Sequence, residues 1–153
     1  MRLSSWLLLP FLLVLSTTVS AQKEESTFGF IHLPAADIQF DAVPEVSGLG
    51  YAVLSGDPNS AGVYVIRLRI SPGLTFPPHS HDQDRHVTVI SGIWAFGTGF
   101  SGKCDNTIPL AAGAYVMHPK GAVHYDGACG DEPVEVQISG LGPVSTTWVE
   151  QIE

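Results

Sequence analysis

Two short segments of the sequence hold histidines in a pattern that suits metal chemistry. His79 and His81 lie two residues apart, directly after the run Gly73-Leu-Thr-Phe-Pro-Pro. Side chains alternate between the two faces of a strand, so these two imidazoles point to the same side. A third histidine, His124, follows a Pro119-Lys-Gly121 turn on another apolar segment. Three imidazoles that converge inside a small β-barrel give a divalent transition metal its protein ligands and leave other coordination positions open.

The segments that must position these histidines are short apolar runs separated by Gly, Pro, Asn and Asp. No segment shows a helical period over three turns. Many short strands with regular turns predict a single all-β sandwich or barrel. The expected strands are Phe28–Leu33, Ile38–Val43, Tyr51–Ser55, Val63–Ile70, Thr75–His79, His86–Ser91, Ile93–Gly97, Ala114–His118, Val134–Ser139 and Thr146–Glu150.

The N-terminus reads as a targeting segment. Met1-Arg2 is positively charged, Trp6–Leu15 is apolar, and Val19-Ser-Ala21 offers small residues for cleavage. This pattern predicts a secretory signal peptide over residues 1–21, which is too short for a transmembrane helix. Residues 22–27 are then a polar, flexible leader and residues 28–153 form the barrel domain. We therefore expect a secreted or periplasmic protein with no membrane association after cleavage.

The net charge and the two cysteines exclude some classes of function. The formal net charge is −8 with only 7 Lys and Arg, so the chain lacks the basic footprint of a protein that binds nucleic acid or anionic membranes. Cys104 and Cys129 are the only cysteines and do not form a Cys-x-x-Cys redox pair. In an oxidising compartment we predict a structural disulfide between them, with two separate thiols as the alternative.

Both histidine segments resemble the two sequence motifs of the cupin superfamily. The first motif reads Gly, five residues, His-x-His, three or four residues, Glu, six residues, Gly, and here it runs from Gly73 through His79 and His81 to Gly92. The second reads Gly, five residues, Pro-x-Gly, two residues, His, three residues, Asn, and here it runs from Gly113 through His124 to Ala128. The resemblance implies a single cupin-type jelly-roll barrel, also called a double-stranded β-helix, of the small exported kind.

The chain departs from the motifs at two positions. Ala128 stands where the second motif has Asn, and Arg85 stands where the first has its metal-binding Glu. Arginine is always charged and cannot bind a metal ion. One alternative is therefore a three-histidine site with Arg85 in the wall of the substrate pocket, which we favour because it keeps six residues before Gly92. The other is a four-histidine site in which His86 is the extra ligand.

The resemblance also implies a function, though no particular reaction. His79, His81 and His124 would bind one divalent metal ion, for which iron, zinc, copper and nickel all suit imidazole ligands. Neutral ligands leave the charge of the ion uncompensated, so we expect a small-molecule anion such as a carboxylate, enolate or phosphate, paired with Arg85. The expected reactions are those of a dioxygenase, decarboxylase, isomerase or lyase, and no residue is assigned to acid–base catalysis. The alternatives are a non-catalytic module that binds metal or a small ligand outside the cytoplasm, and a barrel without metal. Cupins pair through their sheets, which implies a homodimer.

If the chain folds as a cupin, the disulfide has a structural rationale. Cys104 lies between the two motifs and Cys129 lies just beyond the second. These segments approach one another at the rim of such a barrel, so the bond would tether the loop between the motifs near the pocket mouth.

Overall fold

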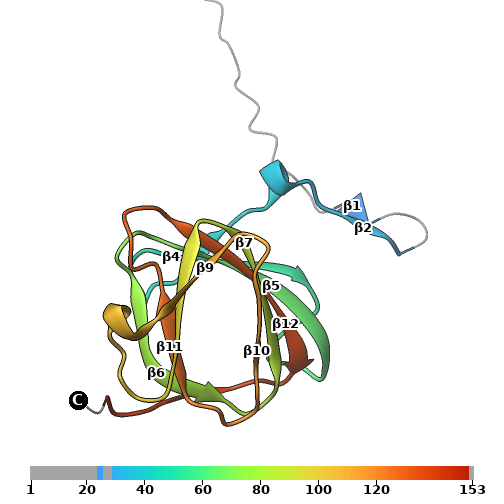
Figure 1. Ribbon diagram of the computed structural model, residues 1–153. Coiled ribbons are helices and arrows are strands. Elements are labelled where there is room, and N and C mark those ends of the chain that lie inside the picture. Colours follow the sequence, from blue (N-terminus) through green and yellow to red (C-terminus); the bar gives the residue numbers. More distant parts are fainter. Residues whose placement is uncertain (1–23, 26–28, 152–153) are drawn as a thin grey trace, which may run out of the picture. The chain divides into compact units, whose positions relative to one another are not determined.

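The computed structural model describes residues 24–25 and 29–151, and these divide between two compact units, Met1–Leu33 and Pro34–Glu153 (Figure 1). In the first unit, β1 (Glu24–Glu25) pairs antiparallel with β2 (Ile31–His32). The predicted signal peptide, residues 1–21, lies outside the described residues, as does the leader at 22–27 except for β1. No helix among the described residues is long and apolar enough to cross a membrane.

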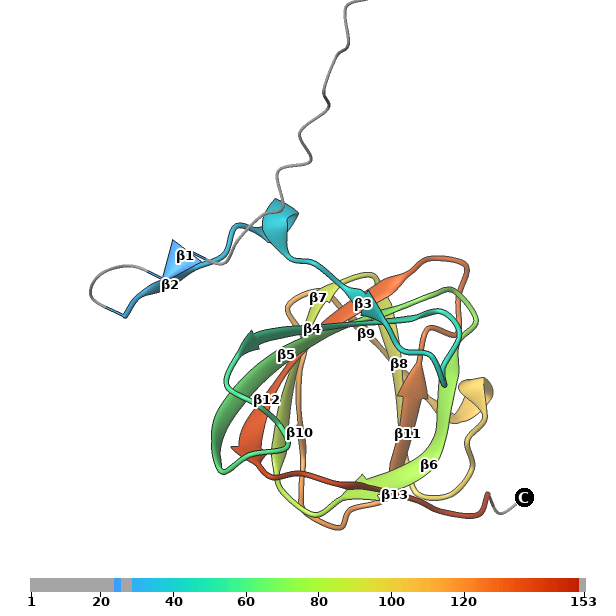
Figure 2. The same cartoon turned by 180° about the vertical axis from the view of Figure 1, so that it is seen from behind.

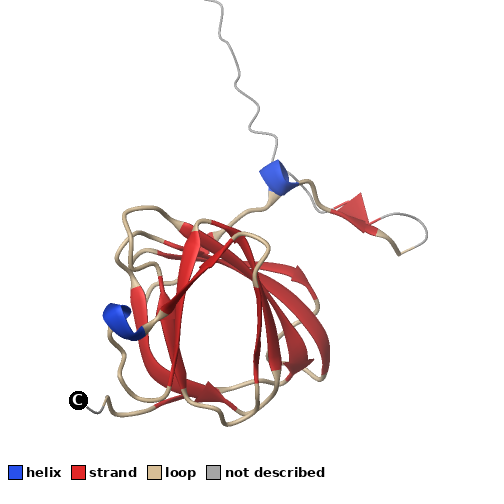
Figure 3. Cartoon of the chain, viewed as in Figure 1, coloured by secondary structure: helices blue, strands red, loops and turns tan. Residues whose placement is uncertain are grey.

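The second unit is built from two antiparallel sheets that face each other across a barrel (Figures 1 and 3). The six-stranded sheet has the order β10-β7-β12-β5-β4-β3 and the five-stranded sheet has the order β13-β6-β11-β8-β9. The first contains β3 (Asp41–Ala42), β4 (Leu49–Ser55), β5 (Gly62–Ile70), β7 (Arg85–Ser91), β10 (Tyr115–His118) and β12 (Val134–Gly142). The second contains β6 (Thr75–His81), β8 (Ile93–Thr98), β9 (Ile108–Ala111), β11 (His124–Gly127) and β13 (Thr146–Trp148). The predicted all-β cupin barrel is therefore confirmed.

Helical structure in the described part of this unit is confined to two short 3-10 turns. These are η1 (Ala35–Asp37), which precedes β3, and η2 (Cys104–Asn106), which lies between β8 and β9. The absence of a helical period in the sequence agrees with this result.

The hydrophobic core lies between the sheets and follows the two-residue period of the strands. On β12, Val134, Val136 and Ile138 are buried and alternate with partly exposed residues. β12 is central because it pairs with β5 on one side and β7 on the other. The largest buried side chain is Trp94 on β8, in the opposite sheet. Buried residues of both sheets thus form one hydrophobic cluster.

β1 falls in the predicted leader and was not expected as a strand. Two strands of the barrel were also not expected from the sequence, and each has a physical reason. β11 reads His-Tyr-Asp-Gly and has no apolar alternation, yet all four residues are buried because β11 pairs with β6 and β8. β9 reads Ile-Pro-Leu-Ala and lies at a sheet edge, where proline is tolerated because no partner needs its missing N–H. Conversely, the strand expected over Ile38–Val43 is reduced to Asp41–Ala42.

The disulfide expected from the sequence is present. Cys104, the first residue of η2, is bonded to Cys129 with a Cα–Cα distance of 5.9 Å. Cys129 follows the end of β11, so the bond ties the loop between β8 and β9 to the chain that leaves the third histidine's strand.

We expect the double substitution Cys104→Ser/Cys129→Ser to lower the free energy of unfolding by about 3 kcal/mol, because the bond closes a loop with a sequence separation of 25 residues and so restricts the unfolded chain. Denaturant titration of the variant and the wild type measures the difference. An unchanged free energy, with the wild-type bond verified by intact mass, would contradict this expectation.

Candidate metal centre

The three sequence-predicted histidines meet on two paired strands. His79 and His81 lie on β6, and His124 on β11 lies directly opposite His79 in the register. All three are buried, and their ligand nitrogen atoms lie within 4.8 Å of one another. Gly121 has a φ of +74° and completes the turn before His124, while its N–H donates to the carbonyl of His81 at 2.7 Å. The turn therefore fixes the entry of the third histidine against the strand that carries the other two.

The hydrogen bonds of the rings leave Nε2 of His79 and Nε2 of His124 free to bind a cation, whereas Nε2 of His81 lies 2.7 Å from Nη1 of Arg85. Nδ1 of His79 lies 2.8 Å from the carbonyl of Pro77, and Nδ1 of His124 lies 3.1 Å from that of Ala122. A carbonyl only accepts, so both Nδ1 atoms carry the proton and both Nε2 atoms present a lone pair. Nδ1 of His81 lies 3.1 Å from Oγ1 of Thr146, which permits the same tautomer.

A divalent transition metal fits this arrangement. Nε2 of His124 is buried and has no hydrogen-bond partner, which is costly for an imidazole unless a ligand uses it. Backbone carbonyls that hold Nδ1 are the usual outer contacts of metal-binding histidines, because they fix the tautomer and the ring orientation. His79, His81 and His124 can therefore hold one metal ion.

Arg85 approaches the triad from β7 and supplies a positive charge. Its Nη1 lies 2.7 Å from Nε2 and 3.2 Å from Nδ1 of His81. The residue as a whole is partly exposed, but its Nε atom is buried and has no hydrogen-bond partner. Burial lowers the pKa of the guanidinium, which nevertheless stays charged at neutral pH because the intrinsic pKa of arginine is so high. No protein carboxylate contacts Arg85 among the salt bridges of the described residues.

A buried carboxyl that sequence reasoning missed also belongs to the site. Asp126 accepts a hydrogen bond from the indole Nε1 of Trp94 at 3.1 Å, and its Oδ2 lies 3.8 Å from Nε2 of His79. Burial raises the pKa of this carboxyl, against the opposing effects of His79 and the indole N–H. The two-residue period from His124 along β11 was the signal that places Asp126 on the same face.

His118 is the second residue that the sequence analysis missed. It ends β10 and is 5% exposed, and its ring centroid lies 3.9 Å from that of His124 and 6.2 Å from that of His81. The rings of Phe96 and Trp94 pack near it, with centroids at 5.2 and 5.8 Å. Neither ring nitrogen has a hydrogen-bond partner. A fourth histidine therefore lies beside the triad.

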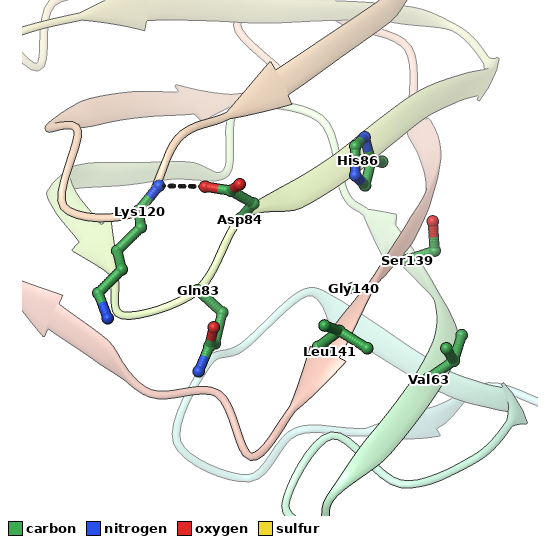
Figure 4. A pocket seen from close by; sticks show the side chains of 8 residues that line it. All are labelled: Val63, Gln83, Asp84, His86, Lys120, Ser139, Gly140 and Leu141. Carbon is green, nitrogen blue, oxygen red and sulfur yellow. Dashed lines mark hydrogen bonds between the residues drawn. The ribbon is translucent and has the colours of Figure 1, made fainter.

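The alternative in which His86 is the fourth ligand does not agree with the structure. His86 is exposed on the outer face of the six-stranded sheet, where its Nδ1 lies 2.7 Å from the hydroxyl of Tyr115. It lines a cavity of about 400 Å³ that also includes Asp84 and Lys120 (Figure 4). In β7, Arg85 points inward and His86 outward because successive side chains alternate. The favoured reading, with Arg85 in the pocket wall, matches the observed placement.

Two histidines of the triad, His79 and His81, line a separate cavity of about 140 Å³. Its polar lining consists of His79, His81, Arg85, His118, Asp126 and Thr146, and the remaining lining residues are apolar. Trp148 on β13 is 57% exposed, and its ring centroid lies 5.1 Å from that of His79. Figure 2 shows β13 beside β6 at the edge of the five-stranded sheet. Trp148 therefore places an aromatic ring between the centre and solvent.

Two aspartates after β6 hold the surrounding loops rather than the centre. Asp82 accepts from the backbone N–H of Ser145 at 2.7 Å, which holds the chain just before β13. Asp84 accepts from the backbone N–H of Lys120 at 2.7 Å, which holds the turn before His124 (Figure 4). Each bond joins segments that are far apart in sequence, and both therefore oppose local unfolding around the pocket.

The fold and this centre agree with sequence comparison. Residues 30–145 match the family described as the ChrR cupin-like domain, and the chain belongs to that family. No curated protein sequence matches the chain.

Solved structures with the same fold include several enzymes. The polyketide cyclase RemF from Streptomyces resistomycificus is 16% identical with a TM-score of 0.61, and the match covers 78% of this chain and 86% of that one. A sugar phosphate isomerase from Silicibacter pomeroyi is 18% identical with a TM-score of 0.61, covering 78% and 82%. The DMSP lyase DddQ from Ruegeria pomeroyi is 18% identical with a TM-score of 0.57, covering 74% of this chain but only 62% of the lyase. At these identities the likeness shows the fold alone.

His81, His124 and the neighbouring His118 are held neutral by their surroundings. Burial, with a smaller contribution from Arg85, lowers the pKa of His81 to about 3. Burial, helped by neighbouring histidines, lowers the pKa of His124 to about 4 and that of His118 to about 2. Neutral imidazole is the form that binds a metal ion.

These shifts make the metal-free protein sensitive to acid. The unfolded chain takes up protons on these histidines below a pH of about 6.5 while the native chain does not, so stability falls as the pH is lowered from there towards the native pKa values. In His118→Leu the unfolded chain takes up one proton fewer. We therefore expect the free energy of unfolding to fall less steeply with decreasing pH than in the wild type, by up to about 1.4 kcal/mol per pH unit. Denaturant titrations between pH 7 and 4.5 in the presence of a chelator measure both slopes. Equal slopes would contradict the expectation.

Proposed function

We propose that this protein is an exported metal-binding cupin that acts as an enzyme on a small organic anion. The observation that carries the proposal is the pairing of three buried, converging imidazoles with a guanidinium in place of a carboxylate. His79, His81 and His124 would hold the ion, and Arg85 lies in contact with His81. Secretion or a periplasmic location is supported by the signal-like N-terminus and by the Cys104–Cys129 disulfide.

The charges around the cavity support an anionic ligand. A dication held by neutral histidines, together with Arg85, leaves an excess of positive charge even when Asp126 is counted as ionised. Such an excess is costly in a buried, largely apolar cavity unless a counter-ion enters. When bound, a divalent ion supplies Lewis acidity and orients the ligand at its open coordination positions. The chain contributes the bidentate donor of Arg85 and an apolar wall that excludes water.

The alternative is a binding module without turnover, and one feature of the site supports it. All the histidines with resolved shifts have pKa values far below neutrality, so none of them is suited to exchange protons near pH 7. The enzyme is favoured by the fold relatives, which include a cyclase, an isomerase and a lyase. Consumption of a candidate anion by catalytic amounts of metal-loaded protein decides for the enzyme, and saturation at one ligand per chain without product decides for the module.

The first expectation concerns metal content. Elemental analysis of the purified wild type is expected to find a single divalent transition ion per chain, drawn from iron, zinc, copper or nickel. His124→Ala should lose it, because the substitution removes the one ligand supplied by β11. His86→Ala is the matched control, since His86 lies outside the cavity and should leave the content unchanged. Metal retained at wild-type level in His124→Ala would overturn the site.

A second expectation separates the roles of Arg85. Arg85→Glu should retain metal more strongly, by about tenfold or more, because it replaces a cation near the ion with a carboxylate. The same variant should bind a small anion more weakly, since it removes the guanidinium. Arg85→Gln is the control that removes the charge without adding a ligand, so it should weaken anion binding and raise metal retention less than Arg85→Glu does. Chelator competition and calorimetric titration measure the two effects, and unchanged values for both would contradict the assignment.

Pairing of two copies into a homodimer is also proposed, on the strength of apolar side chains on the outer face of the six-stranded sheet. Val63, Tyr115, Met117 and Leu141 are all more than 40% exposed there. Sedimentation of the purified protein measures the state, and a monomer at high concentration would contradict it.

A further inference from the structure

Unsatisfied polar atoms of the described residues gather around the centre. Five buried side-chain nitrogen or oxygen atoms have no hydrogen-bond partner, and they belong to Tyr64, Arg85, His118 and His124. Folded proteins leave few such atoms without a partner, and each asks for an explanation. A metal ion accounts for Nε2 of His124. It does not account for the two ring nitrogens of His118, or for Nε of Arg85, whose guanidinium faces the ring of His81 and the hydroxyl of Tyr64.

Arg85 and His118 line the same cavity of about 140 Å³. Arg85 comes from β7 and His118 from β10, which are hydrogen-bonded neighbours, and the two residues are partners in the register. Their polar groups thus enter the cavity from adjacent strands. A molecule in the cavity can contact both at once.

The two groups require different chemistry from that molecule. Arg85 is a cation with only donors, so Nε–H needs an acceptor and is best satisfied by a carboxylate. His118 is a neutral imidazole held among Trp94 and Phe96, and it offers one donor and one acceptor. A hydroxyl or carbonyl oxygen close to the carboxylate meets that requirement.

The rest of the cavity limits the size and the character of the ligand. Its volume of about 140 Å³ lies well below the range of cavities for drug-sized ligands. Apolar side chains of the same six-stranded sheet that carries Arg85 and His118, including Leu68, Val136 and Ile138, also line the cavity. This wall suits a short alkyl group and not a second charge, which disfavours dicarboxylates and sugar phosphates.

We infer that the ligand of this cavity is a short-chain hydroxy- or oxo-carboxylate, whose carboxylate pairs with Arg85 and whose hydroxyl or carbonyl oxygen hydrogen-bonds to His118. The inference rests on the proposed function, since it concerns the anion that the centre takes. It makes His118 a residue that selects the ligand and not a fourth metal ligand. This agrees with the geometry, because the nitrogen atoms that lie within 4.8 Å of one another are those of the triad.

The test is calorimetric titration of the metal-loaded protein with three probes of matched length: 2-hydroxybutyrate, 2-oxobutyrate and butyrate. The wild type is expected to prefer the first two over butyrate by about tenfold or more. His118→Leu should lose most of this preference while it keeps its affinity for butyrate. Arg85→Gln should weaken all three, and His86→Leu, which alters a histidine outside the cavity, should change none.

A metal ion can itself chelate the two oxygens of a hydroxy acid, so the decisive quantity is the change in preference on replacing His118. The visible spectrum of the cobalt-substituted protein is recorded in parallel and should be the same for wild type and His118→Leu. A changed spectrum, or a preference that survives in His118→Leu, would overturn the inference.

Failure of the inference and failure of the proposed function give different results. A wild type that binds metal but shows no preference among the probes refutes the inference and leaves the metal centre in place. A wild type that takes up no metal but still discriminates through His118 refutes the metal centre and retains the ligand assignment. A wild type that binds neither metal nor probe refutes both.

Discussion

The concentration of neutral imidazoles beside a buried guanidinium is the constraint around which the rest of this barrel is organised. Imidazole rings tolerate such crowding only if they remain unprotonated, because each added proton would place another positive charge next to Arg85. Burial enforces that state, and the surrounding apolar core supplies the burial. The same burial leaves ring nitrogens without a hydrogen-bond partner in the protein. The site therefore contains lone pairs and donors that a ligand in the cavity can satisfy.

The strand pairing turns this chemical requirement into fixed geometry. β11 is short and polar, and its position is secured by β6 on one side and β8 on the other. Gly97 on β8 contributes by lacking a side chain, because a Cβ there would overlap the ring of Tyr125 on β11. Tyr125 in turn donates a hydrogen bond to the carbonyl of Asn106 at 2.9 Å, next to the disulfide at Cys104. The outward side of β11 is thus anchored while its inward side presents His124 and Asp126.

The parts of the site that follow simple periodicity were predictable from the sequence, and the parts that depend on contacts between strands were not. His79 and His81 share a face by alternation, and the turn before His124 indicated that this residue is the third histidine of the site. The jelly-roll barrel followed from the same two segments together with the many short strands. Asp126 obeys the same alternation and could have been predicted from His124, had the polar segment been recognised as a strand. His118 is different, because it precedes Pro119 at a strand end and only the pairing of β10 with β7 brings it inside, opposite Arg85. The register of β10 against β7 is set by how the two strands pair in the sheet, and it cannot be read from either segment alone.

This chain has Arg85 where the cupin motif has a carboxylate, and the difference changes which ligands the centre can select. A Glu at this position would neutralise part of the charge of a bound ion and would occupy one of its coordination positions, so the ligand would need less charge of its own. Arg85 does neither: it offers no ligand atom to an ion and adds a positive charge within contact distance of His81. If the centre holds a metal ion, an anion would be needed to balance the charge of the ion and of the guanidinium. Metal and anion binding should accordingly be coupled, each raising the affinity for the other, because each relieves the unfavourable charge that the other leaves in the cavity.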